Sequence, residues 1–129
     1  MPKWRIPPED LVDRFLSLVP DDPGVELRRM FGCPCLFLNG NMFAGIHQED
    51  LFVRLSAEDR HVLLELPGAR LFEPMAGRPM REYVCVPPAM LAERLALESW
   101  LAKARAYAHS LPPKVKKPRP PKRPALPRP

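Results

Sequence analysis

The sequence predicts an α+β fold of two layers, in which helices cover an antiparallel sheet of five or six strands. Two apolar runs, residues 35–38 and 42–46, flank Asn39-Gly40-Asn41, whose residue types accept the positive φ of a tight hairpin turn. Further apolar runs of strand length follow this hairpin. Amphipathic stretches after Pro8 and after Pro88 predict helices that lie on the sheet.

A first helix is predicted to begin after Pro7 and Pro8, because proline suits the first helical position and Glu9 and Asp10 bring negative charge to the first turn. The Asp-Asp-Pro-Gly segment at residues 21–24 ends this helix. The apolar residues between these points follow helical spacing and are Leu11, Val12, Phe15, Leu16, Leu18 and Val19.

Strands are predicted on both sides of the hairpin. Residues 25–31 alternate in part between apolar and charged side chains, and Gly32 and Pro34 interrupt them before the hairpin begins. Residues 51–55 form the next clear strand. Its odd-numbered residues are all apolar and share one side, which predicts a well-buried face.

A short helix and two more strands follow. Ser56, with Asp59 three residues later, resembles a capping box and predicts a helix over residues 57–66. Residues 70–73 and 80–86 are predicted as strands, and the second is rich in residue types that favour extended backbone.

A long last helix is predicted to begin at Pro87 and Pro88 and to end near Ser110. Its apolar residues form one stripe, which needs a sheet or another helix to cover it. The residues of this stripe are Met90, Leu97, Trp100, Leu101, Ala104, Tyr107 and Ala108.

Positive charge is concentrated in the last part of the 129-residue chain. Seven of the 20 Lys and Arg residues lie in residues 112–129, so 13 remain against 15 Asp and Glu in residues 1–111, a net charge of about −2 with His neutral. We predict one domain over residues 1–111 and a disordered Pro-rich tail over 112–129. The seven candidate nucleic-acid contacts of this tail are Lys114, Lys116, Lys117, Arg119, Lys122, Arg123 and Arg128.

The sequence is typical of a cytoplasmic protein. Its three cysteines have no disulfide-scaffold spacing, its first residues show no signal peptide, and no apolar run approaches the ~20 residues of a membrane span. We therefore predict no membrane contact.

Several short motifs follow one another along the chain: Arg29-Met30-Phe31-Gly32, Phe37-Leu38, Gly40-Asn41-Met42-Phe43-Ala44, Leu51-Phe52-Val53-Arg54, Glu82-Tyr83-Val84-Cys85-Val86-Pro87 and, in the last helix, Trp100. In their order and spacing these motifs resemble the TfoX (Sxy) N-terminal domain family over about residues 8–111. The resemblance implies a helix, a three-stranded meander, a helix, two strands and a final helix. Members of known role regulate bacterial natural competence, are thought to act with the cyclic-AMP receptor protein at promoters, and are not known as enzymes. Here a basic tail follows where those regulators have a second, helical domain.

No catalytic constellation is visible, and we predict no catalytic residue, cofactor or metal. Cys33 and Cys35 form a C-x-C pair, but zinc would require Cys85 and His47 to converge on them, and apolar packing is the simpler interpretation. His61 and His109 have no Ser/His/Asp or Cys/His partner nearby in the sequence. A Cys85–His47 pair assembled in space stays open.

Four arginines are candidate anion or partner contacts. Arg28 and Arg29 precede the hairpin, and Arg78 and Arg81 flank the loop before the last strand. Their guanidinium groups would bind phosphate or carboxylate if the two loops share one end of the sheet. Solvated ion pairs with neighbouring glutamates are the alternative interpretation.

An uncovered sheet face would be a partner or homodimer surface. The register of the hairpin has to be known before Phe37 and Phe43 can be placed on a face. The residues of such a surface therefore depend on this register.

The sequence therefore predicts a non-enzymatic regulatory or protein-interaction domain, linked through its resemblance to transcription or competence regulation. The tail would add weak, non-specific binding to nucleic acid. A small-ligand or enzymatic module using the arginines and a cysteine, and a direct nucleic-acid-binding protein, are the alternatives. The tail itself could instead be a solubilising terminus or a Pro-Arg-Pro-Pro ligand for an aromatic groove.

Overall fold

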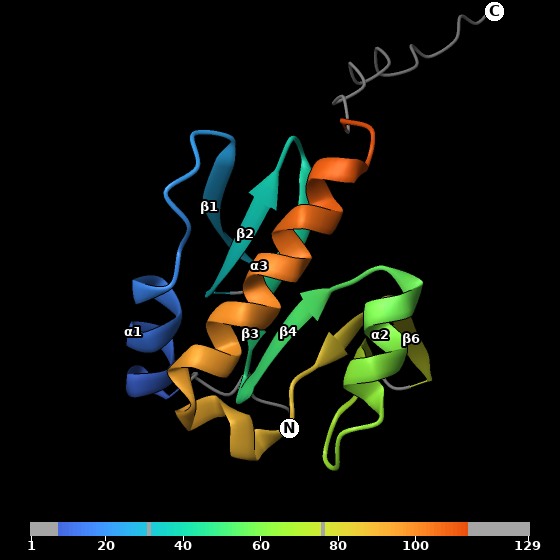
Figure 1. Ribbon diagram of the computed structural model, residues 1–129. Helices are drawn as coiled ribbons and strands as arrows, with labels where there is room; N and C mark the ends of the chain where they lie inside the picture. Colours follow the sequence, from blue (N-terminus) through green and yellow to red (C-terminus); the bar gives the residue numbers. More distant parts are fainter. Residues whose placement is uncertain (1–7, 31, 76, 114–129) are drawn as a thin grey trace, which may run out of the picture.

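The structure, a computed structural model, describes residues 8–30, 32–75 and 77–113. Three α-helices and a six-stranded sheet make up this part of the chain (Figure 1). In chain order the elements are α1 (Glu9–Ser17), β1 (Val25–Met30), β2 (Cys33–Leu38), β3 (Asn41–His47), β4 (Asp50–Arg54), α2 (Ala57–Leu64), β5 (Arg70–Met75), β6 (Arg78–Cys85), the 3-10 helix η1 (Pro88–Ala92) and α3 (Arg94–Ser110).

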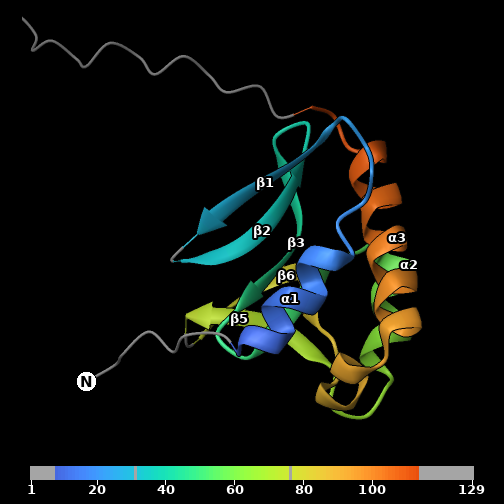
Figure 2. The ribbon, with the colours of Figure 1, turned by 90° about the vertical axis from the view of Figure 1, so that its left-hand side faces the viewer.

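The sheet is antiparallel throughout, in the order β1-β2-β3-β4-β6-β5. All three α-helices lie on one of its faces, and no helix of the described residues lies on the opposite face (Figure 2). The predicted α+β fold is therefore confirmed. The strand predicted over residues 25–31 exists as β1, which makes the meander one strand longer than the family pattern.

The predicted hairpin turn is confirmed. Asn39 and Gly40 have φ values of 52° and 84°, so both occupy the left-handed region that a two-residue turn between β2 and β3 requires. Leu36 of β2 pairs with Ala44 of β3, but the next pair is Phe37 with Met42, so the register shifts between these two pairs. This bulge places Phe37 and Phe43 on opposite faces of the sheet.

Pro34 does not interrupt the sheet, contrary to the prediction. It lies inside β2, opposite Arg29 of β1. The pairing of β2 with β3 begins at Cys35, so Pro34 lies where β2 is paired with β1 alone, a position at which proline is tolerated.

The predicted single last helix is wrong at its start. Residues 88–92 form η1, Glu93 is extended with φ −102° and ψ 92°, and α3 begins only at Arg94. The backbone oxygen of Leu91 accepts a hydrogen bond from Arg14 Nη1 of α1, at 3.0 Å, so this turn serves the contact with α1. Met90 still packs against the core from η1.

The capping interaction at Ser56 is confirmed, because its Oγ accepts a hydrogen bond from the Asp59 N–H at 3.2 Å. The helix that it begins, α2, ends at Leu64 and is two residues shorter than predicted. No helix in the described ranges is long and apolar enough to cross a membrane.

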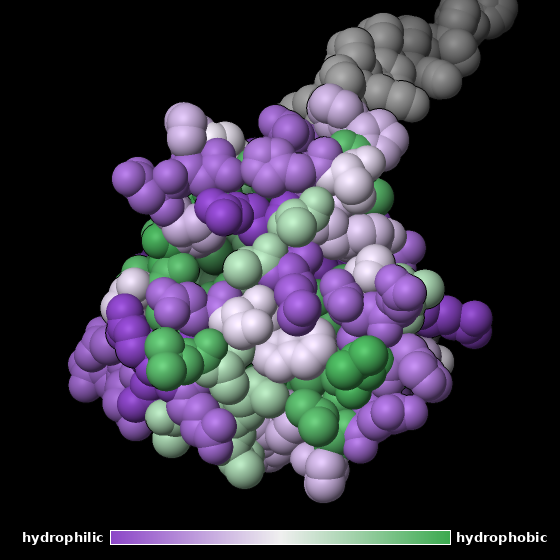
Figure 3. All heavy atoms as spheres, in the orientation of Figure 1, coloured by the Kyte–Doolittle hydropathy of each residue, from purple (hydrophilic) through white to green (hydrophobic). Residues whose placement is uncertain are grey.

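The main hydrophobic core fills the space between the helices and the sheet. Each α-helix contributes fully buried side chains, among them Phe15 of α1, Leu63 of α2 and Leu97 of α3. On the outer side of these helices, hydrophilic residues surround only scattered hydrophobic ones (Figure 3).

Candidate functional site

A second, smaller hydrophobic cluster lies on the helix-free face, which we call the open face. Along β4, Leu51 and Val53 point into the main core and Phe52 points to the open face, as strand alternation requires. On β6, Val84 points to the main core. The open-face cluster consists of Cys35, Phe52, Phe72, Tyr83 and Cys85, with Phe37, Met42 and Met80 packed against it.

The rings of this cluster are held in fixed positions. Phe52 and Phe72 stack with centroids 4.1 Å apart and an interplanar angle of 12°, and Tyr83 meets Phe52 edge-on at 5.8 Å. The Tyr83 hydroxyl donates a hydrogen bond to the Met42 carbonyl at 2.9 Å. Gly45 lies beneath, where an added Cβ would stand 2.7 Å from Phe52 Cζ.

The open face is hollowed by an apolar cleft of about 120 Å³. All six strands contribute to its walls, so the sheet curls around it. Its volume is well below the ~300 Å³ at which small-molecule pockets begin, and it suits the insertion of a side chain. The lining residues are Met30, Cys35, Met42, Ile46, His47, Phe52, Phe72, Pro74 and Met80.

A wider, polar hollow of about 590 Å³ adjoins the cleft and shares His47 and Phe72 with it. Within it, Arg70 Nη2 lies 2.8 Å from Asp50 Oδ2, so these two charges already satisfy each other. The His47 ring meets Phe72 edge-on, with centroids 5.4 Å apart. The hollow therefore forms a polar rim beside the apolar cleft.

The three cysteines are buried free thiols. Cys33 belongs to the main core, whereas Cys35 and Cys85 belong to the open-face cluster. Burial raises the pKa of the Cys85 thiol to about 11, and the Asp50 carboxylate adds to this effect. Burial, together with Cys33, also raises the pKa of Cys35 to about 11. Both thiols are therefore protonated at neutral pH and are poor nucleophiles.

The Cys85–His47 pair that stayed open in the sequence is placed at one site, because both residues line the polar hollow. The raised pKa of this thiol works against activation by the imidazole. His109 lies elsewhere and binds Asp22 at 2.9 Å, and His61 lies 3.3 Å from Glu65 on α2. Among the residues that the structure describes, no three His, Cys, Asp or Glu side chains come together as metal ligands.

Three of the four candidate arginines can be placed, and each lies in its own surroundings. Arg28 forms an ion pair with Glu26 at 3.0 Å and lies over the Phe37 ring, 4.6 Å from its centroid. Arg29 Nη1 donates to the Gly32 carbonyl at 3.4 Å.

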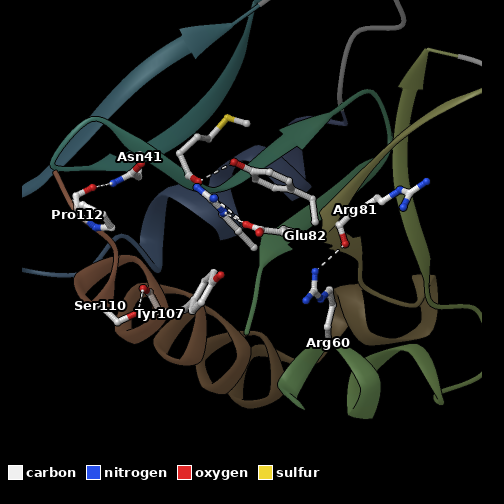
Figure 4. A network of polar contacts seen from close by, with 10 residues as sticks. Asn41, Arg60, Arg81, Glu82, Tyr107, Ser110 and Pro112 are labelled. Carbon is white, nitrogen blue, oxygen red and sulfur yellow. Dashed lines mark hydrogen bonds and ion pairs between the residues drawn. The ribbon is translucent and has the colours of Figure 1, made fainter. Parts of the chain in front are cut away.

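Arg81 is exposed on β6, with β2, β3 and β4 between its strand and β1. Its backbone oxygen accepts a hydrogen bond from Arg60, and its side chain points away from that contact (Figure 4). The side chain of Arg78 lies outside the described part.

The seven tail cations, residues 114–128, also lie outside the described part. The last contact before them is made by Pro112, whose carbonyl accepts a hydrogen bond from Asn41 Nδ2 at 3.0 Å (Figure 4). This contact holds the end of α3 beside the β2–β3 turn.

The sequence reasoning missed Phe72, Pro74 and Met80 as parts of a surface. One available signal was Phe52, which stands between Leu51 and Val53 and makes both sides of β4 apolar. A strand that is apolar on both sides is buried on both faces, or lines a cleft on the second.

Among protein-family models, that of the TfoX N-terminal domain matches residues 18–108 of the chain. No curated protein and no solved structure matches the chain. The matched region contains all six strands, α2 and nearly all of α3.

Proposed function

Because the chain belongs to the TfoX N-terminal domain family, we propose that its folded body is a non-enzymatic interaction domain that receives a protein segment in the cleft of its open face. The setting that we propose is regulatory and linked to transcription or competence. The ligand that we propose is a short extended peptide segment. One bulky apolar side chain of this segment enters the cleft, and polar groups on either side of it contact the polar rim.

The observation that carries this proposal is the cleft itself. Three methionines, Met30, Met42 and Met80, line it together with the stacked rings of Phe52 and Phe72. Methionine side chains are flexible and polarizable and adapt to different apolar partners, whereas the stacked rings give a rigid floor. A cleft of about 120 Å³ holds one large side chain, and the adjoining polar hollow of about 590 Å³ leaves room for the rest of a bound segment beside it.

The chemistry beside the cleft supports a binding role over a catalytic one. The Cys85 thiol has a pKa of about 11, so little of it is thiolate at neutral pH. Arg70 is already paired with Asp50, which leaves a rim that can form hydrogen bonds with a partner.

The test is a selection of displayed random peptides on the full chain. We expect enriched peptides to share one Leu, Met or Phe, and Met80→Glu to weaken their binding by about tenfold or more, because a carboxylate in an apolar cleft loses its hydration. Isothermal titration calorimetry with the enriched peptide measures the change. The matched control is Leu95→Glu, on the exposed face of α3, where Leu95 is 79% exposed.

The control should bind like the unaltered protein. If no peptide is enriched, or if the Met80→Glu variant binds enriched peptides as well as the control does, the cleft is not the docking site.

A second function is favoured by the charge of the tail, which we propose to bind nucleic acid weakly and without sequence preference. Seven cations without one acid, and without an aromatic residue for base stacking, suit contacts to phosphates alone.

Ending the chain after Leu111 should leave the melting temperature unchanged and abolish DNA retention at low salt. Filter binding at increasing salt measures the retention. DNA retention that persists without residues 112–129 would show that the domain, and not the tail, binds the DNA.

A further inference from the structure

Strand β1 is an exposed edge of the sheet. Residues 26–30 are all exposed, and the apolar side chains of Leu27 and Met30 are 47% and 39% exposed. The opposite edge, β5, carries Pro74, a residue that blocks strand pairing, whereas β1 has no proline. β1 also lies apart from the helices (Figure 2). It is therefore the edge of this sheet that can accept another strand.

The pairing with β2 shows which backbone groups of β1 point outward. The two-residue turn makes Leu38 and Asn41 a hydrogen-bonded pair, so the backbone groups of Leu38, Leu36 and Pro34 point toward β3 and away from β1. The Arg29–Pro34 pair is therefore of the type that exchanges no hydrogen bonds. Such pairs alternate along an antiparallel ladder, and the Leu27–Leu36 pair is of the same type. The N–H and C=O groups of Leu27 and Arg29 therefore point away from β2, toward the free edge.

We infer that β1 pairs with β1 of a second copy of this chain, antiparallel, around a two-fold axis at Leu27. In this register Leu27 faces Leu27 of the second copy on the helical side of the sheet. On the open face, Glu26 faces Arg28 of the second copy, and Arg28 faces its Glu26. Opposite charges directly across two strands stabilise the pairing, and the two exposed leucines cover each other.

Charge selects this register over its neighbour. An axis at Arg28 would place the two Arg28 side chains directly opposite each other, and like charges at that position destabilise a pair of strands. Arg28 already lies 3.0 Å from Glu26 of its own strand, so the Leu27 axis would produce a square of four charges in which each charge is next to two of the opposite sign. The axis is perpendicular to the sheet, so both clefts would open on the same side of the dimer.

The inference predicts concentration-dependent dimerisation of the full chain. Sedimentation equilibrium should show the mass rising from 14.7 kDa toward twice that value with concentration. Leu27→Lys should weaken the dimer by about tenfold or more, because it places two ammonium groups at the axis. Leu27 is half-exposed and lies on the face opposite the cleft, so the fold and peptide binding should be retained, which circular dichroism and calorimetry check.

A charge exchange tests the register itself. Glu26→Arg alone should weaken the dimer, because it creates two Arg–Arg pairs, and E26R with R28E should restore it. Leu95→Lys, on α3, is the matched control and should dimerise normally. The inference is overturned by a wild-type chain that stays monomeric at every concentration, by a Leu27→Lys variant that dimerises equally well, or by a double exchange that restores nothing. None of these outcomes bears on peptide binding by the cleft.

Discussion

Phe15→Ala is expected to lower the free energy of unfolding by about 3–5 kcal/mol, the range measured when a fully buried phenylalanine is removed from a core. Phe15 is completely buried, and Leu11 on the same helix and Leu18 directly after it are nearly so. Its ring packs in the main core, where the surrounding strands and helices cannot collapse into the space that it leaves.

This prediction tests whether α1 is part of the folding unit, because the family match begins only at residue 18. Two further contacts join α1 to η1 and to the start of α3: Arg14 donates to the Leu91 carbonyl, and Arg94 Nη1 donates to Ser17 Oγ at 2.9 Å. Urea unfolding followed by circular dichroism measures the loss. Asp13→Ala, exposed on the same helix, should change stability by less than about 0.5 kcal/mol. A loss for Phe15→Ala no larger than that of this control would show that α1 is only loosely attached.

Gly45→Ala is expected to cost about 1–3 kcal/mol, although it adds a single methyl group. The new Cβ would stand 2.7 Å from Cys35 Sγ and 2.7 Å from Phe52 Cζ, closer than real Cβ atoms approach other heavy atoms. Phe52 has little freedom to move away because its ring is stacked on Phe72. The strain therefore reaches the floor of the cleft, and peptide binding should weaken together with stability.

A double-mutant cycle separates this close contact from the general effect of replacing glycine. Cys35→Ala removes the sulfur atom, so Gly45→Ala should cost measurably less in that background than in the wild type. Urea unfolding of the four proteins measures the coupling. Additive losses would show that the contact with Cys35 is not the cause.

Some features could be read from residues close together in the chain. Asn39 and Gly40 predicted the hairpin because a two-residue turn needs positive φ at both positions, and Ser56 predicted the start of α2 because its hydroxyl accepts from a nearby N–H. The break at Glu93 could not be read in this way, because it follows from a contact between η1 and α1, distant in sequence. The positions of the four candidate arginines could not be read from the sequence either, because their spacing along the chain does not show which strands lie between them in the sheet.

The sequence by itself determined the α+β class, the positions of most strands and the concentration of positive charge in residues 112–129, since composition, periodicity and turn chemistry are local properties of the chain. Only the tertiary structure decided which face the helices leave open, on which face Phe37 and Phe43 lie, and that β1 is a free edge. Alternation assigns side chains to two faces but does not say which face is covered. That choice depends on the order of the strands and on where the helices pack, and both are set by contacts between distant residues.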